Sequence, residues 1–106
     1  MQGVEAGNRL EGNPMTTYKK VSRHAISKET DLVVTVIHGV TGPCAFITDP
    51  ALARDTIPLP VEEALISARQ MIGEGLKPRD LVIVDEEDLW DARWGRLVPH
   101  PQRGTA

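Results

Sequence analysis

Cysteine, aromatic residues and long apolar runs are scarce in this sequence. Its single cysteine, Cys44, cannot form a disulfide within the chain, which excludes a disulfide-stapled secreted scaffold and favours a reducing compartment. No apolar run is long enough to span a bilayer, and residues 1–15 lack the apolar core of a signal peptide. We therefore expect a cytoplasmic protein with no membrane segment. Because the aromatic side chains are only Tyr18, Phe46, Trp90 and Trp94, the expected core is mostly aliphatic.

Length and composition indicate one small globular domain. A chain of 106 residues leaves no room for two domains, and 41% hydrophobic with 25% charged residues argues against disorder throughout. Gly, Asn and Glu without periodicity predict a disordered segment over 1–16, while "VPHPQRGTA" predicts a flexible tail over 99–106. The folded domain is then expected over 17–98. Because so small a domain buries limited surface, self-association as a homodimer would add stability.

A β-hairpin is expected near the middle of the chain. "DLVVTVIH" (31–38) and "CAFIT" (44–48) are apolar and β-branched, and "GVTGP" between them is rich in turn residues. Side chains alternate between the two faces of a strand, so the partner of Gly39 decides which residues share a face. If that partner is Pro43, one face collects Leu32, Val34, Val36, His38, Cys44 and Phe46. We prefer this register; a loop one residue longer places His38 and Cys44 on opposite faces.

The clearest helix of the sequence is "PVEEALISARQMIGEG" (60–75). Pro60 suits its first turn, Gly75 suits its end, and one stripe collects the apolar residues Val61, Leu65, Ala68 and Ile72. The short apolar run "DLVIVD" (80–85) predicts a central strand covered on both faces. "WGRLV" (94–98) is a further strand or the end of a short helical segment. The predicted fold class is α+β: a small mixed or antiparallel sheet, made of a β-hairpin and one or two further strands, with one main helix packed on it.

Five carboxylates gather at the end of the 80–85 strand, in "VDEEDLWDARW". A calcium loop needs a glycine for its sharp turn, and here neither a glycine nor a histidine lies among the acids, so no metal site or other cofactor is expected. The simplest interpretation is a charged turn, with Trp90 and Trp94 folded back on the core. The functional alternative is a docking surface for a basic partner. Its candidate residues are Asp85, Glu86, Glu87, Asp88, Trp90 and Asp91.

Cys44 and His38 are the one pair that offers a thiol nucleophile with a base. In the preferred register they face each other across the hairpin, but no third group is visible to orient the imidazole. A free cysteine on an apolar face is more often a small buried hydrophobe. A small-ligand site or a thiol-dependent enzyme on this face is therefore an alternative function, not the leading one. His100, between two prolines, has no second ligand spaced for it and is assigned no role.

The segment before residue 30 is basic. Its cations Lys19, Lys20, Arg23 and Lys28, beside Tyr18, give weak nucleic-acid binding as a second alternative. The net charge of −3 argues against it, because general nucleic-acid binders usually carry a basic face over the whole domain. The contrast between this segment and the later acidic one instead suits two complementary patches, for example on two copies of the molecule.

The sequence shows no convergent set of nucleophile, base or metal ligands. The leading hypothesis is therefore a small non-catalytic domain, an accessory or regulatory module that acts through protein–protein contact. Its expected partner is another protein or a second copy of the chain, and neither a membrane nor nucleic acid is the expected partner.

Overall fold

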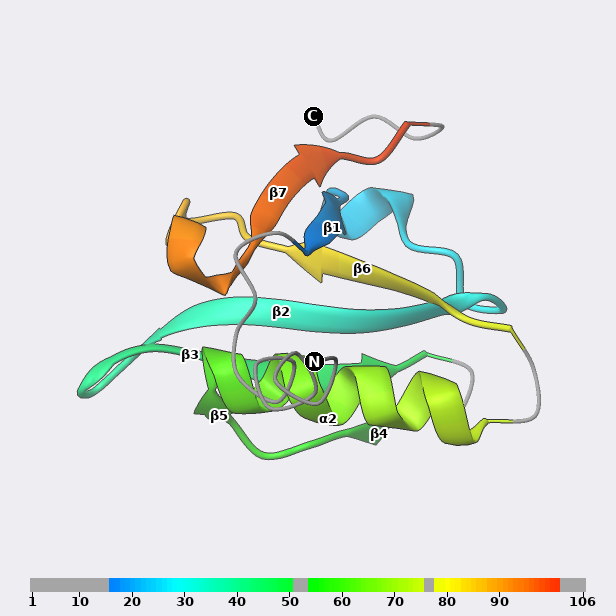
Figure 1. Cartoon of the computed structure of the whole chain (residues 1–106), viewed down its shortest axis with the longest axis horizontal. Coiled ribbons are helices and arrows are strands. Elements are labelled where there is room, and N and C mark those ends of the chain that lie inside the picture. Colours follow the sequence, from blue (N-terminus) through cyan, green and yellow to red (C-terminus); the bar gives the residue numbers. More distant parts are fainter. Residues whose placement is uncertain (1–15, 51–53, 76–77, 102–106) are drawn as a thin grey trace, which may run out of the picture.

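The computed structural model describes residues 16–50, 54–75 and 78–101 (Figure 1). The segment predicted to be disordered lies outside these residues except for Thr16. In chain order the elements are β1 (Thr17–Lys20), the 3-10 turn η1 (Arg23–Ala25), β2 (Asp31–Gly39), β3 (Gly42–Asp49), β4 (Arg54–Asp55), β5 (Leu59–Pro60), α2 (Val61–Glu74), β6 (Asp80–Val84), the 3-10 turn η2 (Ala92–Trp94) and β7 (Arg96–Pro99).

One mixed sheet organises the chain. Its strands follow the order β4-β3-β2-β6-β1-β7, and β5 also pairs with β3. The hairpin strands β2 and β3 are antiparallel, whereas β2, β6, β1 and β7 run parallel to one another. The helix α2, the main helix of the described residues, packs on one face of this sheet (Figure 1). The predicted α+β class, with one main helix on a mixed sheet, is confirmed.

Strand β6 lies at the centre of the sheet, between β2 and β1, as its continuous apolar run predicts. Ile83 faces the main core cluster under α2, while Val82 and Val84 belong to a second cluster on the other face. The segment after β1 covers that second cluster through Ala25 and Ile26. Side chains on both faces of β6 are therefore buried. For this reason polar and apolar residues do not alternate along this strand.

The preferred hairpin register is wrong by one residue. Gly39 pairs with Gly42, not with Pro43, so Ile37 lies opposite Cys44 and His38 lies opposite Pro43. The loop is thus a tight two-residue turn, and β3 begins to pair with β2 one residue earlier in the chain than expected. A shift of one residue moves every side chain of β3 to the other face. The helix-facing side of the hairpin consequently carries Leu32, Val34, Val36, Ala45 and Ile47.

The helix forms as its apolar stripe predicts. Four of its residues are buried against the sheet, namely Val61, Ala64, Leu65 and Ala68. Glu62 and Glu63 lie in the first turn, where the helix dipole favours carboxylates. The helix ends at Glu74, and the backbone N–H of Gly75 donates to the carbonyl of Ile72 at 3.3 Å. Among the described residues no helix is both long and apolar enough to cross a membrane.

The packed part of the chain extends beyond residue 98, where the flexible tail was expected to begin. Pro99 is the last residue of β7, and the backbone N–H of His100 donates to the carbonyl of Lys20 at 2.9 Å. The side chain of His100 is itself buried, with 7% of the residue exposed. The two prolines that suggested a loose end instead flank a residue anchored to β1.

Candidate functional site

The turn after β6 is built around a buried carboxylate. Asp85 is 2% exposed, and its two carboxylate oxygens accept the backbone N–H groups of Leu89 and Trp90, both at 2.9 Å. Asp88 adopts a positive φ of 60°, and this turn lets the next two backbone N–H groups point back to the Asp85 carboxylate. Asp85 therefore organises the turn from inside and is not part of a contact surface. Its burial leaves the Asp85 carboxylate little surface to offer a partner.

Three other predicted interaction residues do lie at the surface. Glu86, Glu87 and Asp88 are exposed side by side, and we call them the acidic turn. Glu86 accepts a hydrogen bond from Arg23 at 3.0 Å, in an exposed ion pair. The basic segment and the acidic turn thus meet within one molecule. The uneven charge of the sequence is in part satisfied internally, so it is not by itself evidence of pairing between copies.

Of the two remaining predicted interaction residues, Trp90 faces inward, whereas Asp91 is partly exposed and pairs with the exposed Arg93. The Trp90 ring stacks edge-on against Tyr18 at 5.5 Å and Trp94 at 5.3 Å, and its Nε1–H donates to the Gly95 carbonyl at 2.9 Å. Asp91 caps η2 by accepting the backbone N–H of Arg93 at 2.9 Å. The aromatic side chains of this stretch thus fold back on the core, as the simplest interpretation of the sequence proposed.

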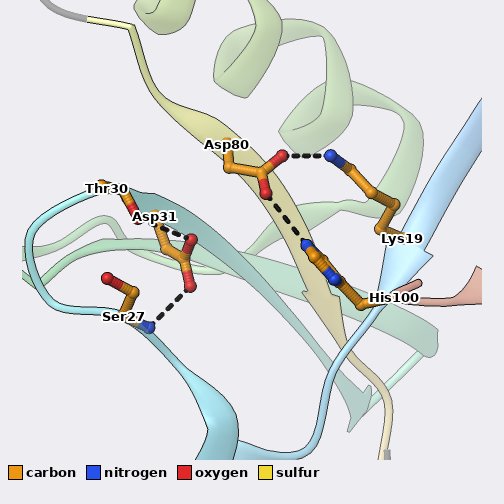
Figure 2. A network of polar contacts seen from close by, with 6 residues as sticks. All are labelled: Lys19, Ser27, Thr30, Asp31, Asp80 and His100. Carbon is orange, nitrogen blue, oxygen red and sulfur yellow. Dashed lines mark hydrogen bonds and ion pairs between the residues drawn. The ribbon is translucent and has the colours of Figure 1, made fainter. Parts of the chain in front are cut away.

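A polar network that the sequence did not suggest gathers around the first residues of β2 and β6. Figure 2 shows Asp80, the first residue of β6, between Lys19 of β1 and His100. The Lys19 ammonium pairs with Oδ1 of Asp80, and Nε2 of His100 lies 3.1 Å from Oδ2. Burial opposes ionisation of Asp80, but hydrogen bonds and positive charge from Lys19 and His100 outweigh it and hold the pKa of this carboxyl below its ordinary value.

A second carboxylate of this network, Asp31, is Asp80's neighbour in the register of β2 and β6. It is fully buried, and it accepts the backbone N–H of Ser27 at 2.7 Å and, at a longer 3.4 Å, the hydroxyl of Thr30 (Figure 2). These bonds close the loop that leads from η1 into β2. The arrangement is that of a structural cap. Within the described residues no three His, Cys, Asp or Glu side chains gather closely enough to hold a metal ion.

The sheet face opposite α2 carries a groove of about 430 Å³. Its floor includes Val33 and Thr35 of β2 and Phe46 of β3, and its wall is the segment after β1 through Ile26. The charged residues at its border are Arg23, Lys28 and Asp55. Its volume falls in the range of about 300–1,000 Å³ common for ligand pockets. This groove depends on the hairpin register, which places Phe46 beside Thr35 on this face, so no pattern in the sequence indicated it.

The structure separates the predicted thiol–imidazole pair. Ile37 and His38 are adjacent on β2, and it is Ile37 that lies across from Cys44, so His38 and Cys44 point to opposite faces of the sheet. Cys44 is partly exposed and His38 is exposed. The prediction that the two meet across the hairpin is wrong for the same one-residue reason as the register.

The predicted nucleic-acid cations are dispersed. Lys19 is engaged by Asp80 and Arg23 by Glu86, while Lys28 is exposed in the loop that precedes β2. Lys20 is half-buried in β1. They do not form one continuous basic face.

Comparison with known proteins adds no functional assignment: no protein-family model, curated protein or solved structure matches this chain.

Proposed function

We propose that this protein is a non-catalytic interaction domain that binds an extended segment of a partner protein in the groove on the open face of its sheet. The observation that carries the proposal is the groove itself. It is an apolar hollow of about 430 Å³ on a sheet face that α2 leaves uncovered, and its floor contains Phe46. An apolar hollow with a polar border is the usual form of a site that takes an anchoring side chain.

The charged residues around the groove favour one orientation of the bound segment. At one end, Arg23 connects the groove to the acidic turn, which follows the carboxyl end of β6. At the other end lies Lys28, ahead of the amino end of β2, and it forms no ion pair with another described residue. The partner segment that fits has an apolar anchor, a basic side chain towards the acidic turn and an acidic side chain towards Lys28.

Binding of a partner segment would break few of the contacts that stabilise the free domain. The Arg23–Glu86 pair is exposed on both sides, with side-chain exposures of 64% and 50%. Such surface pairs contribute about 0–1 kcal/mol, so they can rearrange around a partner. Burial of one Leu-sized anchor contributes roughly 1.5–3 kcal/mol. The anchor in the groove is therefore the main source of affinity, and the charges set orientation.

Peptide display tests this proposal directly. A library of random peptides would be selected on the wild-type domain after depletion on Thr35→Trp, a variant in which an indole fills the groove from a half-exposed position of its floor. We expect enriched peptides to carry an apolar anchor with opposite charges on its two sides. Absence of any enrichment over the Thr35→Trp protein would refute the proposal.

Matched variants assign the contacts of an enriched peptide. Lys28→Glu is expected to weaken binding of peptides with an acidic end, and charge reversal at Glu86, Glu87 and Asp88 should weaken those with a basic end. Val40→Ser is the control, because Val40 is a fully exposed apolar residue at the hairpin tip and does not border the groove. Equal affinity of all these variants for the peptide would count against the groove.

The same protein distinguishes the alternative occupants. Light scattering at increasing protein concentration reports a dimer, in which the partner segment comes from a second copy. Single-stranded DNA binding that falls steeply with salt would support the nucleic-acid alternative instead. A small molecule retained in native mass spectra of the protein from its own cells would point to a ligand site in the groove. The partly exposed single thiol of Cys44 is consistent with the proposed cytoplasmic location, where thiols stay reduced.

A further inference from the structure

The open face of the sheet, opposite α2, continues from the groove towards the tip of the β-hairpin. Val33 of β2 belongs to the core cluster on this face, so Thr35 and Ile37 point the same way along the strand. The register places Phe46 opposite Thr35 and Cys44 opposite Ile37. Thr35, Ile37, Cys44 and Phe46 are half-buried, and we call them the hairpin strip. Because the strip is mostly apolar and partly open to water, a partner that covers it would gain hydrophobic burial.

The two ends of the open face differ in charge. The acidic turn follows the carboxyl end of β6, and Arg23, paired with Glu86, balances one of its three carboxylates. At the other end Lys28 borders the groove, where the carboxylate of Asp55 accepts a hydrogen bond from the Thr48 hydroxyl at 2.7 Å. A two-fold rotation that reverses the strand direction brings the acidic turn of each copy to Lys28 of the other. The open face is therefore complementary to itself in an antiparallel arrangement.

The outer edge of the sheet at β7 offers a second copy much less. The backbone N–H groups of Arg96 and His100 both donate to the β1 side, so the alternate residues Leu97 and Pro99 present the free edge of this strand. Proline has no N–H, so Leu97 is left as the residue of β7 that can both donate and accept in a further ladder. Contact through the open face therefore suits a second copy better than contact through this edge.

The positions of the charges also indicate where two copies would overlap. Thr35 of β2 pairs with Val84 of β6, just ahead of the acidic turn, while Lys28 precedes the amino end of β2. The point midway between the acidic turn and Lys28 therefore lies near Thr35, in the floor of the groove. A two-fold axis at that point places Phe46 of each copy over Thr48 of the other, inside the groove.

We propose that the partner segment in the groove is the β-hairpin of a second copy, packed antiparallel across a two-fold axis. This inference rests on the proposed function and names the partner of the same site. The second copy supplies the three features that the groove favours: Phe46 as the apolar anchor, Lys28 towards the acidic turn, and an acidic turn towards Lys28. Sheets that pack face to face lie about 10 Å apart, a distance that side chains from both faces fill.

Sedimentation velocity of the full chain over increasing concentration tests the proposal. A small interface of this kind is expected to give a dimer with a Kd on the order of 10 μM. Phe46→Thr keeps a residue type favoured in strands and removes the anchor, so it should weaken the dimer about tenfold or more. Met71→Gln is the control, because Met71 is an exposed apolar residue of α2, on the opposite side of the sheet. Dimerisation of Phe46→Thr at the wild-type concentration would refute the proposed interface.

Charge reversal tests the antiparallel arrangement with residues that are exposed in the monomer, so folding is not at risk. Lys28→Glu and Glu87→Lys should each weaken the dimer about tenfold at low salt, because each turns two attractive contacts into repulsive ones. The chain that carries both substitutions restores opposite charges at both contacts and should dimerise like the wild type. Wild-type association of either single variant, or no recovery in the double variant, would refute the arrangement.

The outcomes also separate this inference from the proposed function. A wild-type chain that stays monomeric up to about 1 mM would refute the second copy as partner. The proposed function would stand in that case if peptide display, at a protein concentration below that limit, enriched ligands over Thr35→Trp. It would fail together with the inference if display enriched none.

Discussion

Replacement of Asp85 by alanine is expected to destabilise the protein by about 3 kcal/mol, although the residue lies in a run of surface acids. Asp85 is 2% exposed and accepts two backbone N–H groups, both at 2.9 Å. A hydrogen bond to a charged group contributes about 1.5–3 kcal/mol, so loss of both bonds is worth roughly 3–6 kcal/mol. Because Leu89 and Trp90 are only half-buried, water can reach part of the freed donors and the lower end applies.

Urea unfolding followed by tryptophan fluorescence measures this effect. For a protein of this size the dependence on urea is about 1–1.5 kcal/mol per M, so the midpoint should fall by roughly 2–3 M. Asp85→Asn keeps one acceptor oxygen and should lose about half as much. Glu87→Ala, two residues away and exposed, is the matched control and should stay within about 0.5 kcal/mol of the wild type. If Asp85→Ala unfolds at the same urea concentration as Glu87→Ala, the view of Asp85 as an internal cap is wrong.

Three further predictions follow from the packing. Gly42 and Gly95 share nearly the same φ, 134° and 133°, but a Cβ at Gly42 meets nothing within 4 Å whereas one at Gly95 comes within 2.6 Å of the Thr16 carbonyl oxygen. Gly95→Ala should therefore destabilise more than Gly42→Ala, whose cost is the backbone strain of about 1–2 kcal/mol alone, as compared by thermal unfolding. Leu65→Ala, at a helix position 1% exposed, should cost about 2–5 kcal/mol in the urea experiment. The pKa of Asp80 is lower in the folded protein than its ordinary 3.8, so its contribution to stability is complete above about pH 4 and is lost as the pH falls through the folded value. Asp80→Asn should remove that part of the acid dependence of unfolding. If the variant loses as much stability between pH 5 and 2 as the wild type does, the contribution of the Asp80 network is contradicted.

The helix and the central strand were predicted correctly, because in each the buried residues follow a regular pattern along the sequence. The stripe of α2 repeats with the period of a helix, and Val61, Leu65 and Ala68 are indeed its buried side. The continuous apolar run of β6 reflects cover on both faces, which a central parallel strand requires. In both cases the pattern extends over several residues, so an error at one position does not change the conclusion.

The predicted hairpin register was wrong because it depended on the choice of a single pairing residue in the turn. Both faces of β2 are apolar: α2 covers Leu32, Val34 and Val36, while Val33 belongs to the other cluster under the segment after β1. A strand that is apolar on both sides has no polar side to fix its register. The choice then rested on the turn, where Gly42 at a φ of 134° closes a tighter loop than the sequence alone implied. The separation of His38 from Cys44 and the position of Phe46 in the groove both follow from that single step.

The network around Asp80 could not be predicted for a different reason. Its members come from the two ends of the folded part, since Lys19 is 61 residues and His100 is 20 residues from Asp80. They meet only because β1 inserts between β6 and β7, a parallel arrangement that no local pattern encodes. An acid at the start of a strand and a histidine between prolines each have many ordinary explanations when taken alone. Their pairing is a property of the topology.

Acids of two kinds lie at the ends of the central strands, and the difference between them affects the search for the proposed partner. Asp31 and Asp85 are buried and serve backbone N–H groups at the two ends of the central strands, so their charge is already engaged in folding. Glu86, Glu87 and Asp88 are exposed, and Arg23 balances part of their charge. The charge that a partner meets is therefore much smaller than the run of five acids implies. Under the proposed function, specificity therefore rests more on the shape and apolar floor of the groove than on net charge, and filling the groove at Thr35 is a sharper test than reversing the acids.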